Sequence, residues 1–531
     1  MSKARKKLGV RLSRWALRHP IWVFALGVAA LTTASLGAKD LWVPDETRHG
    51  AVLLQMLENG HWLALHLGEE FYADKPPLYF WLLAALALAT GSTGPPVFMA
   101  AAALSGWAFL AALAVLGRRA GLSRQAVLTA GLILLSTWFF VERLHHPRMD
   151  LLFGAFIMLA QAGMLSAVQT GRGAPLAFAA AGLAVLTKGP LGIALPLVSL
   201  LAGLMIYRPH PPGLGRDLSA GITVFVAMMA LYLGGVAWVA GWGAVAALLF
   251  DQSLGRAVAA PSLSQPVWWY IGPLAAALLP WTLAVAAVRP RHLQRGGTGW
   301  LWASLAGSFV LLSLLDYKTT HFLVLLIGPL ALGLAQALCH VSAGPRRVMF
   351  LGMAALIALA AALLPFAPGW TLWPEQVQGA LLVAAATALA AALALLAHRR
   401  ATATFAATLW IGITVTALPY YLITIHGLDA VMSPRAAGEA LAREAALGRP
   451  VVEYHPSYRG IFDYHAGLSL TQVESFPALD AVVAQHPCGT VAMRARDASK
   501  WETAPKALAE ISQHRLDATR YVLLRWGGLA C

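Results

Sequence analysis

The chain has 531 residues, of which 59% are hydrophobic and only 12% are charged, and its mean hydropathy is +0.66. Soluble globular proteins are typically about 45–50% apolar and about 25% charged, so this composition excludes a single soluble core and also excludes disorder. Three cysteines in this length exclude a disulfide-rich secreted scaffold. The net charge of +15 does not indicate nucleic-acid binding, because the basic residues lie in short tracts between apolar runs, a pattern typical of membrane proteins.

The N-terminal segment, residues 1–20, contains seven Lys and Arg residues and no acid, and an apolar run follows it from Ile21 to about Ala38. A run of about 18 residues is long enough to span a bilayer. We interpret it as an uncleaved first transmembrane helix rather than as a signal peptide. The basic segment before it predicts a cytoplasmic N-terminus.

About thirteen apolar runs of spanning length predict an all-α polytopic membrane domain over residues 21–426. After the first run, they are residues 97–116, 126–141, 151–168, 174–187, 190–207, 220–249, 267–288, 298–315, 320–338, 347–364, 377–396 and 403–425. Basic tracts in alternate loops mark the cytoplasmic side, so the other loops, of which 39–77 is the first, are predicted to lie outside. The apolar stretch 78–89 would cover only about 18 Å as a helix, so it is predicted to lie along the outer interface.

Residues 427–531 have no spanning run and predict a small α/β domain on the outer side. Strands are predicted near 450–454, 489–493 and 520–524, and helices near 457–467 and 505–514. An odd number of spans leaves this domain on the opposite side from the N-terminus. Cys488 and Cys531 would then lie in an oxidising compartment, where they either form a disulfide or remain as two thiols.

Most ionisable residues outside the basic tracts lie in the predicted external loops, and this asymmetry is the main functional signal. Together they predict an external pocket with two carboxylates and several cations: Asp45, Lys75, Arg148, Asp150, Lys188 and Lys318. Lys and Arg would hold phosphate, while a carboxylate would orient or deprotonate a nucleophile or hold a divalent cation. The sequence has no Gly-rich phosphate loop, so a cytoplasmic nucleotide donor is not predicted.

Five motifs in this order resemble those of the lipid A aminoarabinose transferase family and the related bacterial protein-mannosyltransferase-like proteins, which are GT-C membrane glycosyltransferases. They are DETRH at 45–49, DKPPL at 74–78, RMD at 148–150, LTKGP at 186–190 and YKTTHF at 317–322. The sequence departs from the family at His49, where the usual residue is Tyr, and at Asp74, where it is Glu. These departures leave the identity of the sugar and of the acceptor open.

The resemblance implies transfer of a sugar, in the closest branch an amino sugar, from an undecaprenyl-phosphate carrier to a phosphate of lipid A, with inversion. It also implies a location in the bacterial inner membrane, with the tail in the periplasm. Asp45 and Asp150 are the expected catalytic carboxylates. The resemblance leaves open whether a divalent cation is used, and if one is, these two residues are the first candidates as its ligands. The residues expected to bind substrate are Glu46, Arg48, Asp74, Lys75, Arg148, Lys188, Lys318 and His321.

Three other functions remain open at this point. A protein or glycan O-glycosyltransferase of the same fold would need a true general base for a hydroxyl acceptor. A transporter or flippase would carry charges in the middle of its spans, whereas here the charges gather at span ends. An inactive scaffold of the same fold would not need both Asp45 and Lys75, which the sequence retains.

Overall fold

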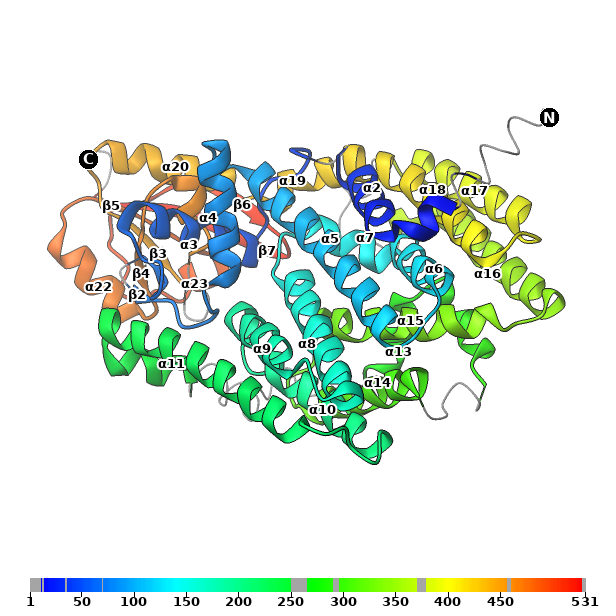
Figure 1. The fold of residues 1–531 in the computed structure, drawn as a ribbon. Helices are drawn as coiled ribbons and strands as arrows, with labels where there is room; N and C mark the ends of the chain where they lie inside the picture. The colour runs from blue at the N-terminus through cyan, green and yellow to red at the C-terminus, as the bar shows by residue number, and fades with distance from the viewer. Residues whose placement is uncertain are drawn as a thin grey trace. The chain divides into compact units, whose positions relative to one another are not determined.

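The structure, a computed structural model, describes residues 11, 14–33, 36–68, 70–249, 265–289, 296–369, 379–455 and 460–527 (Figure 1). Within these residues, eight helices are long and apolar enough to cross a membrane, and a ninth span results if one bent helix pair is counted. The chain is therefore a multi-pass membrane protein, although the predicted number of thirteen spans is not confirmed. Most of the predicted external loop 251–266 and Cys531 lie outside the described residues.

The chain divides into two compact units, which are described separately. The first unit, residues 1–36, 74–79 and 98–424, is the helical membrane unit. The second unit, residues 37–73, 80–97 and 425–531, combines the first loop with the tail. The predicted domain boundaries at residues 20 and 426 stay a prediction.

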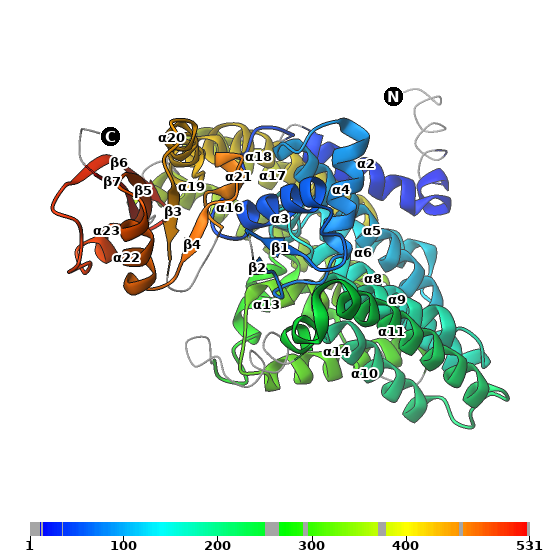
Figure 2. The same ribbon diagram turned by 90° about the vertical axis from the view of Figure 1, so that its left-hand side faces the viewer.

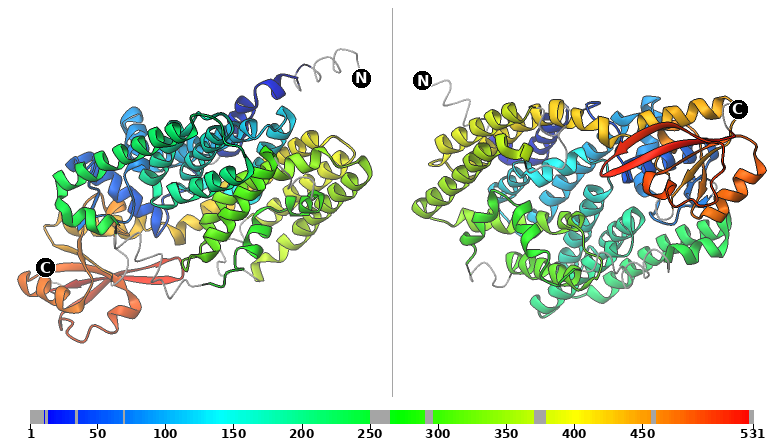
Figure 3. Two further views of the ribbon diagram at one scale, coloured as in Figure 1. Left: turned by 60° about the horizontal axis from the view of Figure 1, so that its bottom comes forward. Right: turned by 180° about the vertical axis from the view of Figure 1, so that it is seen from behind.

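The membrane unit is built almost entirely of α-helices (Figures 1 and 3). They are α2 (Pro20–Thr32), α5 (Pro95–Arg119), α6 (Arg124–Leu135), α7 (Trp138–His145), α8 (Asp150–Thr170), α9 (Ala174–Lys188), α10 (Leu191–Ile206), α11 (Leu214–Ala246), α13 (Ile271–Ala277), α14 (Gly297–Leu314), α15 (Val324–Cys339), α16 (Ala343–Leu363), α17 (Ala380–Ala397) and α18 (Thr402–Pro419). Helix α8 packs against α9 and α10, and α6 packs against α15 and α18. Small residues allow the close approach of α8 and α9, since a Cβ at Gly163 would lie 2.7 Å from the Cβ of Ala177.

Three predicted spans are interrupted in the structure, and one of them, 220–249, is kinked at Gly241. The run 126–141 is not one straight helix, because α6 and α7 meet at an angle of 67°. At the break, the hydroxyls of Ser136 and Thr137 donate to carbonyls of the preceding turn, a pattern that often bends helices. The run 267–288 is also broken, into α13 and a 3-10 segment, Trp281–Ala287, with Pro280 between them.

The second unit contains a five-stranded sheet in the order β4-β3-β5-β7-β6, in which β3 is parallel to both β4 and β5 and the other pairs are antiparallel (Figure 2). Its strands are β3 (Val451–Tyr454), β4 (Thr471–Val473), β5 (Gly489–Arg494), β6 (Leu508–Leu516) and β7 (Thr519–Trp526). Its tail helices are α19 (His426–Met432), α20 (Arg435–Ala446), α21 (Asp463–Ala466), α22 (Phe476–Gln485) and α23 (Ala495–Ala498). The first loop supplies α3 (Asp45–Asn59) and a short hairpin of β1 (His66–Leu67) and β2 (Glu70–Phe71), and α4 (Leu78–Thr90) follows them in the chain.

The three predicted tail strands are confirmed, but the predicted helix at 505–514 is wrong. That segment forms β6, which pairs with β7 across a tight turn at Asp517 and gives the long hairpin seen in Figure 3. Cross-strand pairing therefore overrides the local helical pattern. Of the predicted helix at 457–467, the described part is helical only over α21. Cys488 is disulfide-bonded and Cys339 is free.

A pair of buried acids inside the tail predicts a pH-dependent stability. The side chain of Gln472 donates to both Glu453 and Asp463, at 3.4 Å and 3.2 Å. Burial raises the pKa of Glu453, with the charge of Asp463 adding to it, and burial also raises the pKa of Asp463. An acid whose pKa is raised on folding stabilises the fold at low pH and loses this contribution as pH rises through the folded pKa.

We therefore expect the free energy of unfolding of the tail to fall by about 2–4 kcal/mol between pH 6 and pH 9. Glu453→Gln removes one titrating group and should reduce this slope, as measured by thermal unfolding of the intact protein at both pH values. The exposed acid Glu502 offers a matched control, because Glu502→Gln should leave the slope unchanged. Equal slopes for the wild type and Glu453→Gln would contradict the assignment.

Candidate active site

The candidate catalytic residue Asp45 is the first residue of α3, directly after Pro44. An acidic residue in the first helical turn interacts favourably with the partial positive charge of the helix N-terminus. Asp45 is half-buried, so it is shielded but reachable. On the next turn, the guanidinium of Arg48 lies 5.4 Å from the ring centroid of Tyr72, and the buried His49 packs edge-on against Phe80 at 5.5 Å.

Glu46, which was predicted to bind substrate, holds the first loop against the start of α3. The ammonium of Lys39 donates to both carboxylate oxygens of Glu46, at 2.6 Å and 2.5 Å, and the backbone N–H of Trp42 donates to Glu46 at 2.9 Å. Lys39 and Glu46 are both buried. Because the Glu46 carboxylate already accepts three hydrogen bonds, its geometry favours a positioning role.

The tail fastens the same loop through a second carboxylate, Asp40. Its oxygen Oδ2 accepts hydrogen bonds from Arg435 at 2.8 Å and from Ser433 at 2.7 Å. Burial opposes ionisation of Asp40, but the hydrogen bond from Arg435 and the charge of His465 outweigh burial, so the pKa of Asp40 lies below its ordinary value. Asp429 reinforces the connection by accepting from the indole of Trp42 at 2.5 Å.

Close packing also ties the tail to α3. The ring of Tyr464 lies against Gly50, where a Cβ would overlap the ring atoms. The hydroxyl of Tyr464 donates to the carbonyl of Thr93 at 2.9 Å, and the amide of Gln55 donates to the hydroxyl of Ser469. The tail therefore sets the position of the helix that carries Asp45.

In the membrane unit, the second predicted catalytic carboxylate, Asp150, lies at the start of α8 and is buried. Lys188, at the end of α9, donates to its Oδ1, and Nε of Arg148 lies 3.3 Å from its Oδ2. The Lys188 ammonium also lies 5.5 Å from the ring centroid of Phe322. The structure thus brings three of the predicted site residues into one cluster.

A further cation in this region, Arg143, was not predicted from the sequence. It lies on α7, is buried, and shares a hydrogen bond of 2.7 Å with Nδ1 of His321, a predicted site residue. It also pairs with Glu142 at 2.5 Å, and Glu142 lies 3.2 Å from His146, so this acid pairs with two basic side chains. An Arg at the end of an apolar run was the available signal.

The other predicted cations of this unit differ in their environment. Lys75 is partly buried and pairs with Asp74 at 3.0 Å. Lys318 is buried, and its ammonium donates to the carbonyls of Gln265 at 2.8 Å and Leu315 at 2.5 Å. Lys318 therefore holds the chain at the end of α14, and this geometry favours a structural role over substrate contact.

The predicted site residues fall into two sets. Asp45, Glu46 and Arg48 belong to the second unit, and the remaining seven belong to the membrane unit. Among the described residues, no three His, Cys, Asp or Glu side chains gather as a metal site. Asp150 does not fit a divalent cation, because Lys188 and Arg148 already neutralise its carboxylate.

Comparisons with known proteins agree with the motifs. Residues 74–238 match the family described as dolichyl-phosphate-mannose-protein mannosyltransferase. The undecaprenyl phosphate-alpha-4-amino-4-deoxy-L-arabinose arabinosyl transferase of Pseudomonas savastanoi pv. phaseolicola is 28% identical over 61% of this chain and 64% of its own length. A transferase of the same name from Pseudomonas fluorescens is 27% identical over 65% of this chain and 64% of its own length. The chain thus spans a little less than two thirds of these relatives.

The solved structures give the fold. The crystal structure of ArnT from Cupriavidus metallidurans bound to undecaprenyl phosphate has a TM-score of 0.76 to this chain at 20% identity, and the match covers 95% of this chain and 97% of ArnT. An archaeal oligosaccharyltransferase from Archaeoglobus fulgidus has a TM-score of 0.50 at 12% identity. The predicted fold class, a helical GT-C membrane protein with a small C-terminal sheet domain, is confirmed, and so is the resemblance to the lipid A aminoarabinose transferases.

Proposed function

We propose that this chain, a relative of the lipid A aminoarabinose transferases, is a membrane glycosyltransferase. It transfers an amino sugar from an undecaprenyl-phosphate carrier to a phosphate of lipid A at the periplasmic face of the inner membrane. The observation that carries the proposal is the match to transferases named for an undecaprenyl-phosphate aminoarabinose donor. The family match over residues 74–238, which contain Lys75, Asp150 and Lys188, supports it.

The proposed reaction follows from the charges of the acceptor phosphate and of the carrier phosphate. An oxygen of the acceptor phosphate attacks the anomeric carbon as the bond from that carbon to the carrier phosphate breaks, and the bonding electrons leave with undecaprenyl phosphate. An acceptor phosphate is already anionic at neutral pH, so no strong base is required. Asp45 then orients the acceptor or stabilises positive charge that develops at the anomeric carbon.

In this proposal, cationic side chains stabilise the leaving group, undecaprenyl phosphate. The carrier keeps its polyprenyl tail in lipid, so its phosphate must react at the membrane border. Lys75 follows the first loop directly and precedes the apolar α4, which suits a group that meets a phosphate at that level. A fixed ammonium there lowers the barrier by stabilising the charge that develops on the leaving phosphate. Arg148 and Lys188 extend the cationic surface within the membrane unit.

The proposed orientation places the N-terminus in the cytoplasm and the tail in the periplasm. Two observations support it: the basic N-terminal segment, and the disulfide at Cys488, since disulfides persist in oxidising compartments.

Mass spectrometry of lipid A from the host, with and without this gene, tests the proposal. We expect loss of a phosphate-linked sugar, whose mass distinguishes a pentose from a hexosamine. Complementation with the wild-type gene should restore the sugar. Unchanged lipid A would refute the proposed acceptor, and the same comparison would then be made on surface glycans and proteins.

A further inference from the structure

A second polar site lies in the membrane unit, in a hollow of about 550 Å³ between the start of α2, the end of α5 and the start of α6. Its lining is partly apolar and partly basic. The apolar lining is Leu17, Pro20, Ile21, Ala114 and Val115, and the basic lining is Arg18, Arg118, Arg119 and Arg124. Among the described residues, none that lines the hollow is acidic, so the arginines are not neutralised by the lining itself.

The four arginines have different local roles. Arg118 and Arg119 lie in the last turn of α5, where cations interact favourably with the helix dipole, and Arg118 donates to the carbonyl of Leu122 at 2.9 Å. Arg124 is the first residue of α6, where the partial positive charge of the helix opposes a cation. Arg18, Arg119 and Arg124 are exposed. A bound anion would offset both the unfavourable position of Arg124 and the mutual repulsion of the guanidinium groups.

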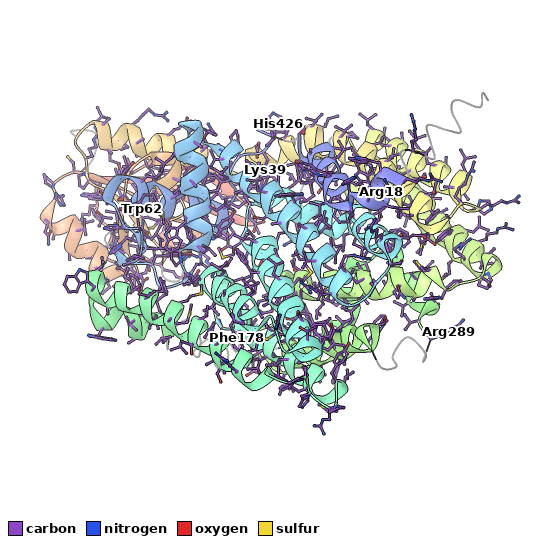
Figure 4. All side chains as sticks on the ribbon, viewed as in Figure 1. Arg18, Lys39, Trp62, Phe178, Arg289 and His426 are labelled. Atoms are coloured by element: carbon purple, nitrogen blue, oxygen red, sulfur yellow. The ribbon has the colours of Figure 1, made fainter. Side chains whose placement is uncertain are left out.

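Tryptophans near the hollow indicate its level in the membrane. Trp15 and Trp22, on the helical turns beside Arg18, are 48% and 64% exposed. The indole of Trp107 on α5 donates to the carbonyl of Ile21 at 3.3 Å, which fixes α5 against α2. Tryptophan is enriched at the membrane–water interface, so the hollow lies at the level of lipid headgroups (Figure 4 labels Arg18 at this end of α2).

We propose that this hollow binds the phosphate headgroup of an anionic phospholipid from the leaflet that the basic tracts face, with the acyl chains along the apolar wall. Charge complementarity and depth identify this occupant. Four arginines line one hollow, and guanidinium groups bind phosphate through paired N–H donors. A soluble phosphate has no acyl chains and would leave the apolar part of the lining without a contact. Asp45, Lys75 and Asp150 do not line the hollow, so the proposal does not depend on the proposed reaction.

The test titrates phosphatidylglycerol onto the delipidated full-length protein in detergent and counts bound lipid by native mass spectrometry. Each basic residue near a membrane surface contributes about fivefold in affinity, so Arg119→Gln with Arg124→Gln should weaken the tightest phosphatidylglycerol by roughly 25-fold. Arg118 is left in place because it supports the turn after α5. Arg399→Gln with Arg400→Gln is the matched control, since this exposed pair does not line the hollow and should change the affinity less than threefold.

Three outcomes would overturn the proposal. The first is an unchanged affinity of the Arg119/Arg124 variant for phosphatidylglycerol. The second is equally tight binding of phosphatidylcholine, which has the same chains but no net charge. The third is displacement of the lipid by equimolar glycerol phosphate, which would assign the arginines to a soluble phosphate. If the double variant does not fold, Arg18→Gln alone, with an expected loss of about fivefold, repeats the comparison.

Discussion

Replacing Asp45 with asparagine should reduce sugar transfer at least about 100-fold without unfolding the protein. The substitution forfeits only the attraction of one carboxylate to the helix N-terminus, about 0.3–1 kcal/mol, and Glu46 remains in the same turn, so α3 should keep its N-terminus. The substitution removes the negative charge that would orient the acceptor or stabilise the anomeric carbon. The loss should appear in kcat more than in KM, because this interaction strengthens in the transition state. Lipid A mass spectrometry in cells and transfer by the purified protein in detergent measure it.

The control for this experiment lies on the same helix. Glu58 is exposed near the far end of α3, and Glu58→Gln removes the same charge from the same element. It should retain activity within about twofold, and both variants should unfold at the temperature of the wild type. Full activity of Asp45→Asn would remove the catalytic assignment and leave the fold untouched.

The sequence predicted the helical membrane class and the tail strands at β3, β5 and β7. It also placed Arg148, Asp150 and Lys188 among the six charges of one pocket, and the structure pairs these three. These features depend on apolar run length and on charges placed at span ends, which are local signals. The bend between α6 and α7 was missed, because Ser136 and Thr137 look like ordinary span residues until their hydroxyls are seen to bond the preceding turn. β6 was missed because its strand depends on pairing with β7.

For the candidate site, too, the sequence predicted local features but not the contacts between distant residues. The sequence identified Asp45, Asp150 and Lys188 as chemical groups but did not predict what holds them. Lys39 and Asp40 follow the first apolar run directly, yet their partners are Glu46 on α3 and Arg435 in the tail, and the second of these is 395 residues away. No spacing rule connects residues at that separation, so the role of the tail in placing α3 came only from the structure.

Asp150 and Lys188 allow a test that separates structural support from chemistry. Asp150→Asn should lower the free energy of unfolding by about 3 kcal/mol or more, because Lys188 and Arg148 would then be left buried without their carboxylate. Removing the ammonium as well, in Asp150→Asn with Lys188→Met, should recover part of that loss, since only the uncompensated charge of the more exposed Arg148 then remains. Thermal and denaturant unfolding of the purified protein in detergent measure both changes.

The transfer activity of the same variants shows whether Asp150 and Lys188 take part in the reaction or only stabilise the fold. If Asp150 only orients Lys188 and Lys188 contacts the donor phosphate, the double variant should be stable and still at least about 100-fold less active. If the pair is purely structural, the double variant should regain activity together with stability. Asp316→Asn, an exposed acid of the same unit, should change stability by less than about 0.5 kcal/mol and leave transfer intact. Recovery of both properties would move the donor phosphate to Lys75 and Arg148, because these two predicted site residues are only partly buried, whereas the predicted Lys318 is buried.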